Sequence, residues 1–178
     1  MINPREIGAI LPSSVFLAEK MLSSVHFQRA KFIAEYGPGT GVFTDKILKY
    51  RNRDTIVMLI ESNEEFYQLL CEKYKNDCNM IIVRGSAENI DTYIKEYNIP
   101  YLDYVISGLP FASLPKKVSE VILDKTKELL GSDGQFITFQ YTLFKKSLLS
   151  QFFRHIDIKY ECRNLPPAFV LSCKNELL

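Results

Sequence analysis

The 178-residue sequence predicts an α/β fold, with a seven-stranded, mostly parallel sheet, helices on both faces and a C-terminal antiparallel hairpin. Three observations support this prediction. Short apolar segments suited to buried strands alternate with amphipathic helical segments. The first apolar segment runs directly into a glycine-rich loop. The last two strand candidates are joined too tightly for a crossover connection, so they should pair as a hairpin.

The predicted elements follow one another at a spacing that is typical of parallel α/β sheets. The central strand candidates are apolar at most positions, as expected for strands that are buried on both faces. The first helix has a possible cap at Ser13 or Ser14. The predicted strands are residues 30–36, 55–60, 80–83, 101–107, 135–141, 156–162 and 168–173. The predicted helices are residues 14–24, 41–50, 63–75, 88–97, 115–130 and 143–154.

Length and composition indicate one folded domain over residues 1–178. The chain is 47% hydrophobic and long enough for a real core, which excludes a disordered protein. We expect residues 1–29 to form an N-terminal extension and a helix that covers the site, and residues 30–178 to form the core. The four cysteines have no metal-binding spacing, so we predict neither a metal site nor a disulfide framework.

The charge is close to neutral overall but unevenly distributed. The formal net charge of +1 is too small to indicate a nucleic-acid-binding surface. Residues 1–31 hold four Lys/Arg and two Asp/Glu, residues 141–178 hold six and three, and the middle of the chain holds twelve and sixteen. No signal peptide and no apolar run of ~20 residues is present, so we expect a cytoplasmic protein.

The loop after the first strand is the main candidate binding site. The segment FIAEYGPGTGVFT (residues 32–44) places Gly37, Gly39 and Gly41 at alternating positions, two residues after Glu35. Glycines let a backbone turn tightly and approach a ligand. A dinucleotide fingerprint would need a glycine at Val42. A carboxylate at Glu35 would repel a pyrophosphate and suits a ligand with a cationic ammonium group.

The ends of the second and third strands complete a nucleoside site. Glu61 can accept two hydrogen bonds from a ribose diol. Ser86, Ala87 and Glu88 are placed to contact an adenine ring, although Ser86 can equally be a helix cap. These features together predict S-adenosyl-L-methionine as the cofactor. The predicted cofactor-binding residues are Glu35, Tyr36, Gly37, Gly39, Thr40, Gly41, Glu61, Ser62, Ser86, Ala87, Glu88, Ser107 and Leu109.

Four motifs resemble those of the class I S-adenosylmethionine-dependent methyltransferases, which have a Rossmann-like fold. The resemblance spans about residues 8–175, and two subfamilies share it: the ribosomal RNA adenine dimethylases and the bacterial phospholipid N-methyltransferases. The motifs at residues 8–21 and 164–170 resemble the phospholipid enzymes and discriminate best. The four motifs are GAILPSSVFLAEKM, EYGPGTGVFT, SGLPFASLP and NLPPAFV.

The end of the fourth strand separates the two subfamilies on chemical grounds. Adenine-N6 methyltransferases resemble one another in an Asn/Asp-x-Pro-aromatic tetrad, which orients the exocyclic amine and stacks on a flipped base. Here residues 108–111 read Gly-Leu-Pro-Phe, so the polar side chain is missing. The resemblance therefore implies methylation of phosphatidylethanolamine-type lipids at an anionic membrane surface, with peripheral contact at its inner face. It favours neither a nucleic-acid partner nor an obligate protein partner.

The catalytic residues are less well defined than the cofactor loop. The acceptor amine must be uncharged to attack, so the site has to desolvate it or provide a base. Tyr141 and Glu19 are the candidates for this base, and His155 is expected instead to cap a helix or pack. Two alternatives stay open: methylation of adenine in ribosomal RNA, and a cofactor-binding module without turnover. Candidates for binding a lipid phosphate are Arg163, Lys145 and Lys146.

Overall fold

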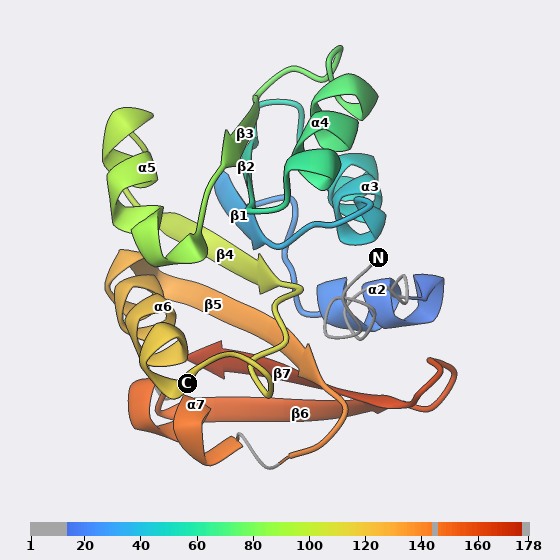
Figure 1. The fold of residues 1–178 in the computed structure, drawn as a ribbon, viewed down its shortest axis with the longest axis vertical. Helices are drawn as coiled ribbons and strands as arrows, with labels where there is room; N and C mark the ends of the chain where they lie inside the picture. Colours follow the sequence, from blue (N-terminus) through green and yellow to red (C-terminus); the bar gives the residue numbers. More distant parts are fainter. Residues whose placement is uncertain (1–13, 144–145, 176–178) are drawn as a thin grey trace.

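A computed structural model describes residues 14–143 and 146–175, whose strands form one sheet in the order β3-β2-β1-β4-β5-β7-β6 (Figure 1). All neighbouring strands are parallel except β7, which runs antiparallel to both β5 and β6. The predicted sheet and its C-terminal antiparallel hairpin are therefore confirmed. The strands are β1 (Phe32–Tyr36), β2 (Ile56–Glu61), β3 (Met80–Arg84), β4 (Leu102–Ser107), β5 (Leu130–Gln140), β6 (His155–Glu161) and β7 (Ala168–Lys174).

Helices cover both faces of the sheet, so that two hydrophobic cores lie on either side of it (Figure 1). One core lies beneath α5, α6 and α7, and the other beneath α2, α3 and α4. The helices are α2 (Val15–Leu22), α3 (Val42–Tyr50), α4 (Glu64–Lys73), the 3-10 helix η1 (Ala87–Asn89), α5 (Ile90–Glu96), α6 (Lys116–Leu129) and α7 (Lys146–Phe152).

Strand β1 contributes to both cores because successive side chains of a strand point to opposite faces. Ala34 and Tyr36 lie in the core beneath α6, whereas Ile33 lies in the core beneath α3. Glu35 therefore points toward α3 together with Ile33, and its carboxylate accepts a hydrogen bond from Thr44 of that helix. The alternation thus buries this carboxyl group beneath the glycine loop.

Helix α2 packs against the sheet as predicted for its amphipathic pattern. The Ser14 hydroxyl caps it by accepting from the Leu17 backbone N–H at 3.1 Å, and Ser13 lies outside the described residues. The inward face is buried, whereas Val15 and Phe16 are exposed to solvent. The buried residues of α2 are Leu17, Ala18, Met21 and Leu22.

Most element ends differ from the sequence prediction by a few residues, and two of the differences change the local structure. Strand β5 begins at Leu130, directly after α6, because residues 131–134 bulge out between the pairs Leu102–Leu130 and Tyr104–Gln135. The expectation that His155 caps a helix or packs is wrong. This residue begins β6, pairs with Lys174 and is exposed, because α7 already ends at Phe152.

Candidate active site

The carboxyl ends of β1, β2 and β4 meet at one edge of the sheet. The Gly37 N–H donates to the Ile60 carbonyl at 2.9 Å, and the Gly108 N–H donates to the Tyr36 carbonyl at 2.8 Å. These bonds fix the loops that follow the three strands side by side. Open α/β sheets bind their ligands at this edge, so the predicted site lies where the fold can form one.

The three glycines of the loop all have left-handed backbone conformations. Their φ angles are +63° at Gly37, +56° at Gly39 and +84° at Gly41, a region that other residues rarely adopt. A Cβ at Gly41 would collide with the Tyr74 hydroxyl, whereas a Cβ at Gly39 would meet no heavy atom of the described residues within 4 Å. The loop is therefore packed at its helical end and open at Gly39, where a ligand can approach the backbone.

Glu61 lies directly across from this open position. Its Oε2 accepts from the Gly39 N–H at 3.0 Å, and its Oε1 accepts from the Asn63 N–H at 2.8 Å. Each carboxylate oxygen has a second lone pair that is free to accept from a hydroxyl group. The residue is 6% exposed, so it is held in one position at the edge of the site. This arrangement fits a ribose diol.

Glu35 is fully buried beneath the loop, and its environment keeps it protonated. Its Oε2 accepts from the Thr44 hydroxyl at 2.7 Å, while Oε1 has no hydrogen-bond partner among residues 14–143 and 146–175. Burial raises the pKa of Glu35 to about 8, with smaller contributions from Asp45 and Glu61, and the Thr44 bond opposes the rise. A nearby cation would lower this pKa. Contact of Glu35 with the ammonium group of a ligand stays a prediction.

The loop is braced from α4 by two residues that the sequence analysis missed. Lys73 Nζ donates to the Thr40 carbonyl at 3.1 Å and to Asp45 Oδ2 at 2.7 Å. Tyr74 Oη lies 3.1 Å from the Gly41 carbonyl and 2.8 Å from Asp45 Oδ1. These contacts join positions about thirty residues apart, so no local sequence pattern predicts them.

At the end of β3, Ser86 acts as the helix cap. Its hydroxyl accepts from the Glu88 N–H at 3.2 Å and lies 3.1 Å from Glu88 Oε2. Ala87 is buried beside them, and Ser62 lies exposed at the end of β2. The Glu88 carbonyl accepts from Lys125 of α6 at 2.6 Å, which holds this corner in place. Contacts of these residues with an adenine ring stay a prediction.

The end of β4 packs against the glycine loop. The buried Ser107 hydroxyl accepts from the Leu109 N–H at 3.2 Å, and Leu109 covers Gly37. At Gly108, an added Cβ would lie 2.6 Å from the Gly37 carbonyl oxygen. Phe111 is 1% exposed and packs edge-on against Phe136 in the core.

Tyr36 takes part in the site through its backbone only. Its side chain is fully buried, and its hydroxyl lies 3.0 Å from the Thr126 hydroxyl on α6. Only its carbonyl, which accepts from Gly108, lies at the loop. The predicted cofactor contact of Tyr36 is therefore restricted to the main chain.

The two candidate bases lie in different surroundings. Burial raises the pKa of Tyr141, and a hydrogen bond with the Asn164 side chain opposes the rise, so the phenol is neutral at neutral pH. Glu19 of α2 forms an ion pair with Lys46 of α3 at 2.9 Å, which lowers the pKa of Glu19. Both are weak bases in this structure. Their catalytic roles stay predictions.

The candidate phosphate ligands are also spread over several surroundings. Arg163 is bound to Glu161, with Nε 2.8 Å from Oε1. Lys146 begins α7, and Lys145 lies outside the described residues.

The part of the chain that the structure describes contains no group of three or more His, Cys, Asp or Glu side chains arranged for a metal ion. It also contains no helix with the length and apolarity needed to cross a bilayer.

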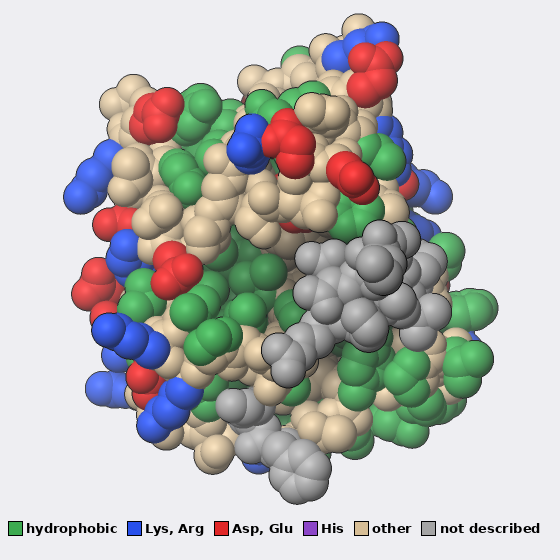
Figure 2. Space-filling view, viewed as in Figure 1, with side chains coloured by type: hydrophobic (Ala, Val, Ile, Leu, Met, Phe, Trp, Pro, Cys, Tyr) green, Lys and Arg blue, Asp and Glu red, His purple; other side chains and the backbone are tan. Residues whose placement is uncertain are grey.

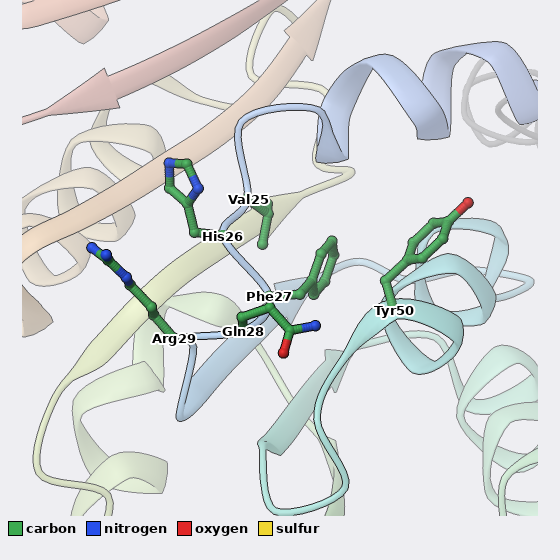
Figure 3. Close-up of a pocket in the computed structure, with 6 residues that line it drawn as sticks. All are labelled: Val25, His26, Phe27, Gln28, Arg29 and Tyr50. Carbon is green, nitrogen blue, oxygen red and sulfur yellow. The ribbon is translucent and has the colours of Figure 1, made fainter.

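A cavity of about 520 Å³ lies at the opposite end of β1, where the chain enters the sheet (Figure 3). The rings of Phe27 and Tyr50 are 5.7 Å apart in its wall. His26 and Arg29 point away from these rings, so the polar groups of the cavity do not converge (Figure 3). This cavity is not part of the candidate site.

Comparison with known proteins shows a family and several relatives. The sequence model of the family described as "Ribosomal RNA adenine dimethylase" matches residues 13–151. An ornithine lipid N-methyltransferase from Singulisphaera acidiphila is 29% identical over 94% of this chain and 88% of its own length. Ribosomal RNA small subunit methyltransferase A from Coxiella burnetii is 27% identical over 54% of this chain, but the match spans only 35% of that relative's length.

Among solved structures, precorrin-6y C5,15-methyltransferase from Geobacter metallireducens superposes with a TM-score of 0.71. The superposition covers 90% of this chain and 88% of the other, at 13% sequence identity. At this level of identity the likeness shows a common fold.

Proposed function

Because the chain belongs to the ribosomal RNA adenine dimethylase family of S-adenosylmethionine-dependent methyltransferases, we propose that it methylates the amine of a membrane lipid. The enzyme class and the cofactor, S-adenosyl-L-methionine, follow from the family. The acceptor is our proposal: a phosphatidylethanolamine-type lipid or another lipid with a primary amine.

The end of β4 is the observation that carries this proposal. Enzymes that methylate adenine need a polar side chain to orient the exocyclic amine and an aromatic ring to stack on the base. Gly108 supplies no side chain, and the Gly37 carbonyl lies 2.6 Å from where a Cβ would be. Phe111 is packed in the core. A tetrahedral alkyl amine requires neither of these two devices.

Two further observations support a lipid acceptor. The relative that matches nearly the whole chain is by its name an ornithine lipid N-methyltransferase, whereas the match to the ribosomal RNA enzyme covers about half of it. The formal net charge of +1 also provides little attraction for RNA.

The residues of the site have distinct parts in this mechanism. The cofactor supplies an electrophilic methyl group when it is bound. The open backbone at Gly39 and the Glu61 carboxylate would hold its ribose, and residues 86–88 its adenine. A primary amine titrates near ~10 in water, so the site has to favour the uncharged form by desolvation. The neutral Tyr141 hydroxyl can accept a hydrogen bond from that amine and so direct its lone pair.

A methylation assay with a panel of acceptors tests the proposal. The enzyme is incubated with radiolabelled cofactor and vesicles that contain phosphatidylethanolamine, ornithine lipid, or phosphatidylcholine alone as the control without an acceptor amine. We expect label in lipids with a primary amine only. Gly39→Arg, which fills the open position of the loop, should abolish cofactor binding and all labelling. Absence of labelled lipid from an enzyme that binds the cofactor would refute the lipid acceptor.

Ribosomal RNA is the second candidate acceptor, and the family match over residues 13–151 favours it. In that case the same assay with RNA should yield labelled dimethyladenosine and no labelled lipid. Binding to RNA should also weaken steeply as salt is added, because phosphate contacts release counterions.

A further inference from the structure

Exposed apolar side chains from two distant segments form one surface, which we call the apolar tip (Val15, Phe16, Leu165 and Pro166). Val15 is 55% exposed, Phe16 43% and Leu165 86%. The Ser14 N–H donates to Asn164 Oδ1 at 3.2 Å, which joins the start of α2 to the β6–β7 loop. Figure 2 shows hydrophobic side chains gathered over this region of α2 and the β6–β7 loop.

Hydrogen bonds within the β6–β7 loop hold the backbone that carries Leu165 in one conformation. Asn164 is buried, and its Nδ2 donates to the Pro166 carbonyl at 2.7 Å. Glu161 accepts from the backbone N–H and from the side chain of Arg163, at 3.0 and 2.8 Å. The Arg163 guanidinium in turn lies 4.4 Å from the centre of the Phe16 ring. Single exposed apolar residues are common, but a fixed cluster of them marks an interaction surface.

The charges around the apolar tip are mainly positive. Lys20 and Arg163 lie beside it, with Lys20 Nζ 3.7 Å from Glu161. Lys159 lies at the other end of α2, where its Nζ is 3.1 Å from the Ser23 hydroxyl. Two carboxylates lie near these groups in the part of the chain that the structure describes: Glu161, which is buried, and Glu19, which is paired with Lys46. An apolar surface with a cationic border matches an anionic bilayer in both chemistry and charge.

The apolar tip lies at the same edge of the sheet as the cofactor loop. Strands β5 and β6 both run antiparallel to β7, so the β6–β7 loop and the end of β5 share one edge. The pairing of Gln140 with Phe169 places Tyr141, which follows β5, beside this loop. The ion pair between Glu19 and Lys46 links α2 to the helix that follows the glycine loop. A surface in contact with the tip is therefore adjacent to the edge of the sheet that carries the cofactor loop and Tyr141.

We propose that the apolar tip inserts into the interfacial region of an anionic bilayer and holds the site edge against the lipid head groups. This inference rests on the proposed function for its purpose, which is delivery of a lipid amine, but binding to the membrane can be measured without turnover. Each tip residue that leaves water should strengthen binding about tenfold, given the usual free energy of burying such a side chain.

Vesicle co-sedimentation tests the proposal with phosphatidylcholine vesicles and with vesicles of phosphatidylcholine and phosphatidylglycerol. We expect the protein to bind the anionic vesicles more strongly. Leu165→Ser and Phe16→Ser should each weaken binding about tenfold. Leu69→Ser is the matched control, because Leu69 of α4 is exposed to the same 43% as Phe16 but lies away from the tip. Thermal unfolding of each variant checks that folding is unchanged, which we expect for the largely exposed Leu165.

Each outcome decides between this inference and its competitors. Equal vesicle binding by Leu165→Ser, Phe16→Ser and wild-type protein would overturn the inference, as would failure of the wild type to bind anionic vesicles. Sedimentation velocity tests a second copy of the chain as the occupant, and a dimer that Leu165→Ser dissociates would also overturn it. Vesicle binding that depends on the tip, without any lipid methylation, would support the membrane surface and refute only the proposed acceptor.

Discussion

Replacing Gly108 with alanine should damage the cofactor site even though Gly108 is not among the residues with positive φ. The added Cβ would lie 2.6 Å from the Gly37 carbonyl oxygen and 3.5 Å from that of Tyr36. Both neighbours are backbone atoms in a loop that hydrogen bonds tie to β2 and β4. The methyl group can be accommodated only if the glycine loop moves away from β4.

The expected cost of this overpacking is about 1–3 kcal/mol. If the displacement falls entirely on the cofactor site, affinity should drop roughly 5- to 150-fold, since each 1.4 kcal/mol corresponds to a factor of ten. Isothermal titration calorimetry with S-adenosyl-L-methionine measures the affinity. Thermal unfolding of the protein without cofactor measures the part of this free energy that lowers folding stability and not cofactor affinity.

Gly39→Ala provides the matched control, because residue 39 needs glycine for its backbone conformation and not for lack of space. Its φ is +56°, while an added Cβ would meet no heavy atom within 4 Å in residues 14–143 and 146–175. Alanine there should cost about 1–2 kcal/mol of folding stability through the left-handed backbone alone. Asparagine tolerates this conformation, so Gly39→Asn should recover part of the loss, whereas Gly108→Asn should be no better than Gly108→Ala. Wild-type cofactor affinity and stability in Gly108→Ala would refute the steric argument, and with it the argument against an adenine tetrad.

Three further predictions concern titratable groups. Glu61→Gln should weaken cofactor binding about tenfold by calorimetry, because it replaces one charged acceptor oxygen with a donor; unchanged affinity would contradict the ribose assignment. Burial raises the pKa of Glu35 from 4.5 to about 8, so the folded chain keeps a proton that the unfolded chain loses in this range. Stability should therefore fall as pH rises between these values, by at most about 1.4 kcal/mol per pH unit, and Glu35→Gln should flatten the profile in denaturant titrations. Parallel profiles for the two proteins would show that Glu35 does not carry this effect. Tyr141→Phe should lower kcat about tenfold with little change in KM, whereas Glu19→Gln should change neither by more than about threefold, because its exposed ion pair contributes little. A larger loss of kcat in Glu19→Gln than in Tyr141→Phe, measured by steady-state kinetics, would identify Glu19 as the residue that acts on the amine.

The sequence by itself determined the features that depend on local rules. The alternation of apolar strands and helices predicted the sheet, and the short connection at residues 163–167 predicted the antiparallel pair of β6 and β7. Gly37, Gly39 and Gly41 were identifiable because left-handed turns favour glycine over other residues. The Ser14 cap was equally predictable, since a helix start needs an acceptor for its free N–H groups.

Only the tertiary structure decided how these parts meet. Because successive side chains of β1 point to opposite faces, Glu35 is buried against Thr44 of α3. The side chain of Tyr36 points away from the loop, toward α6. The close approach of Gly108 to Gly37 arises where β1 and β4 lie side by side, because the two residues follow neighbouring strands. The apolar tip joins Phe16 to Leu165, which are separated by almost the whole chain. Such contacts depend on strand order and helix placement, so no local pattern could announce them.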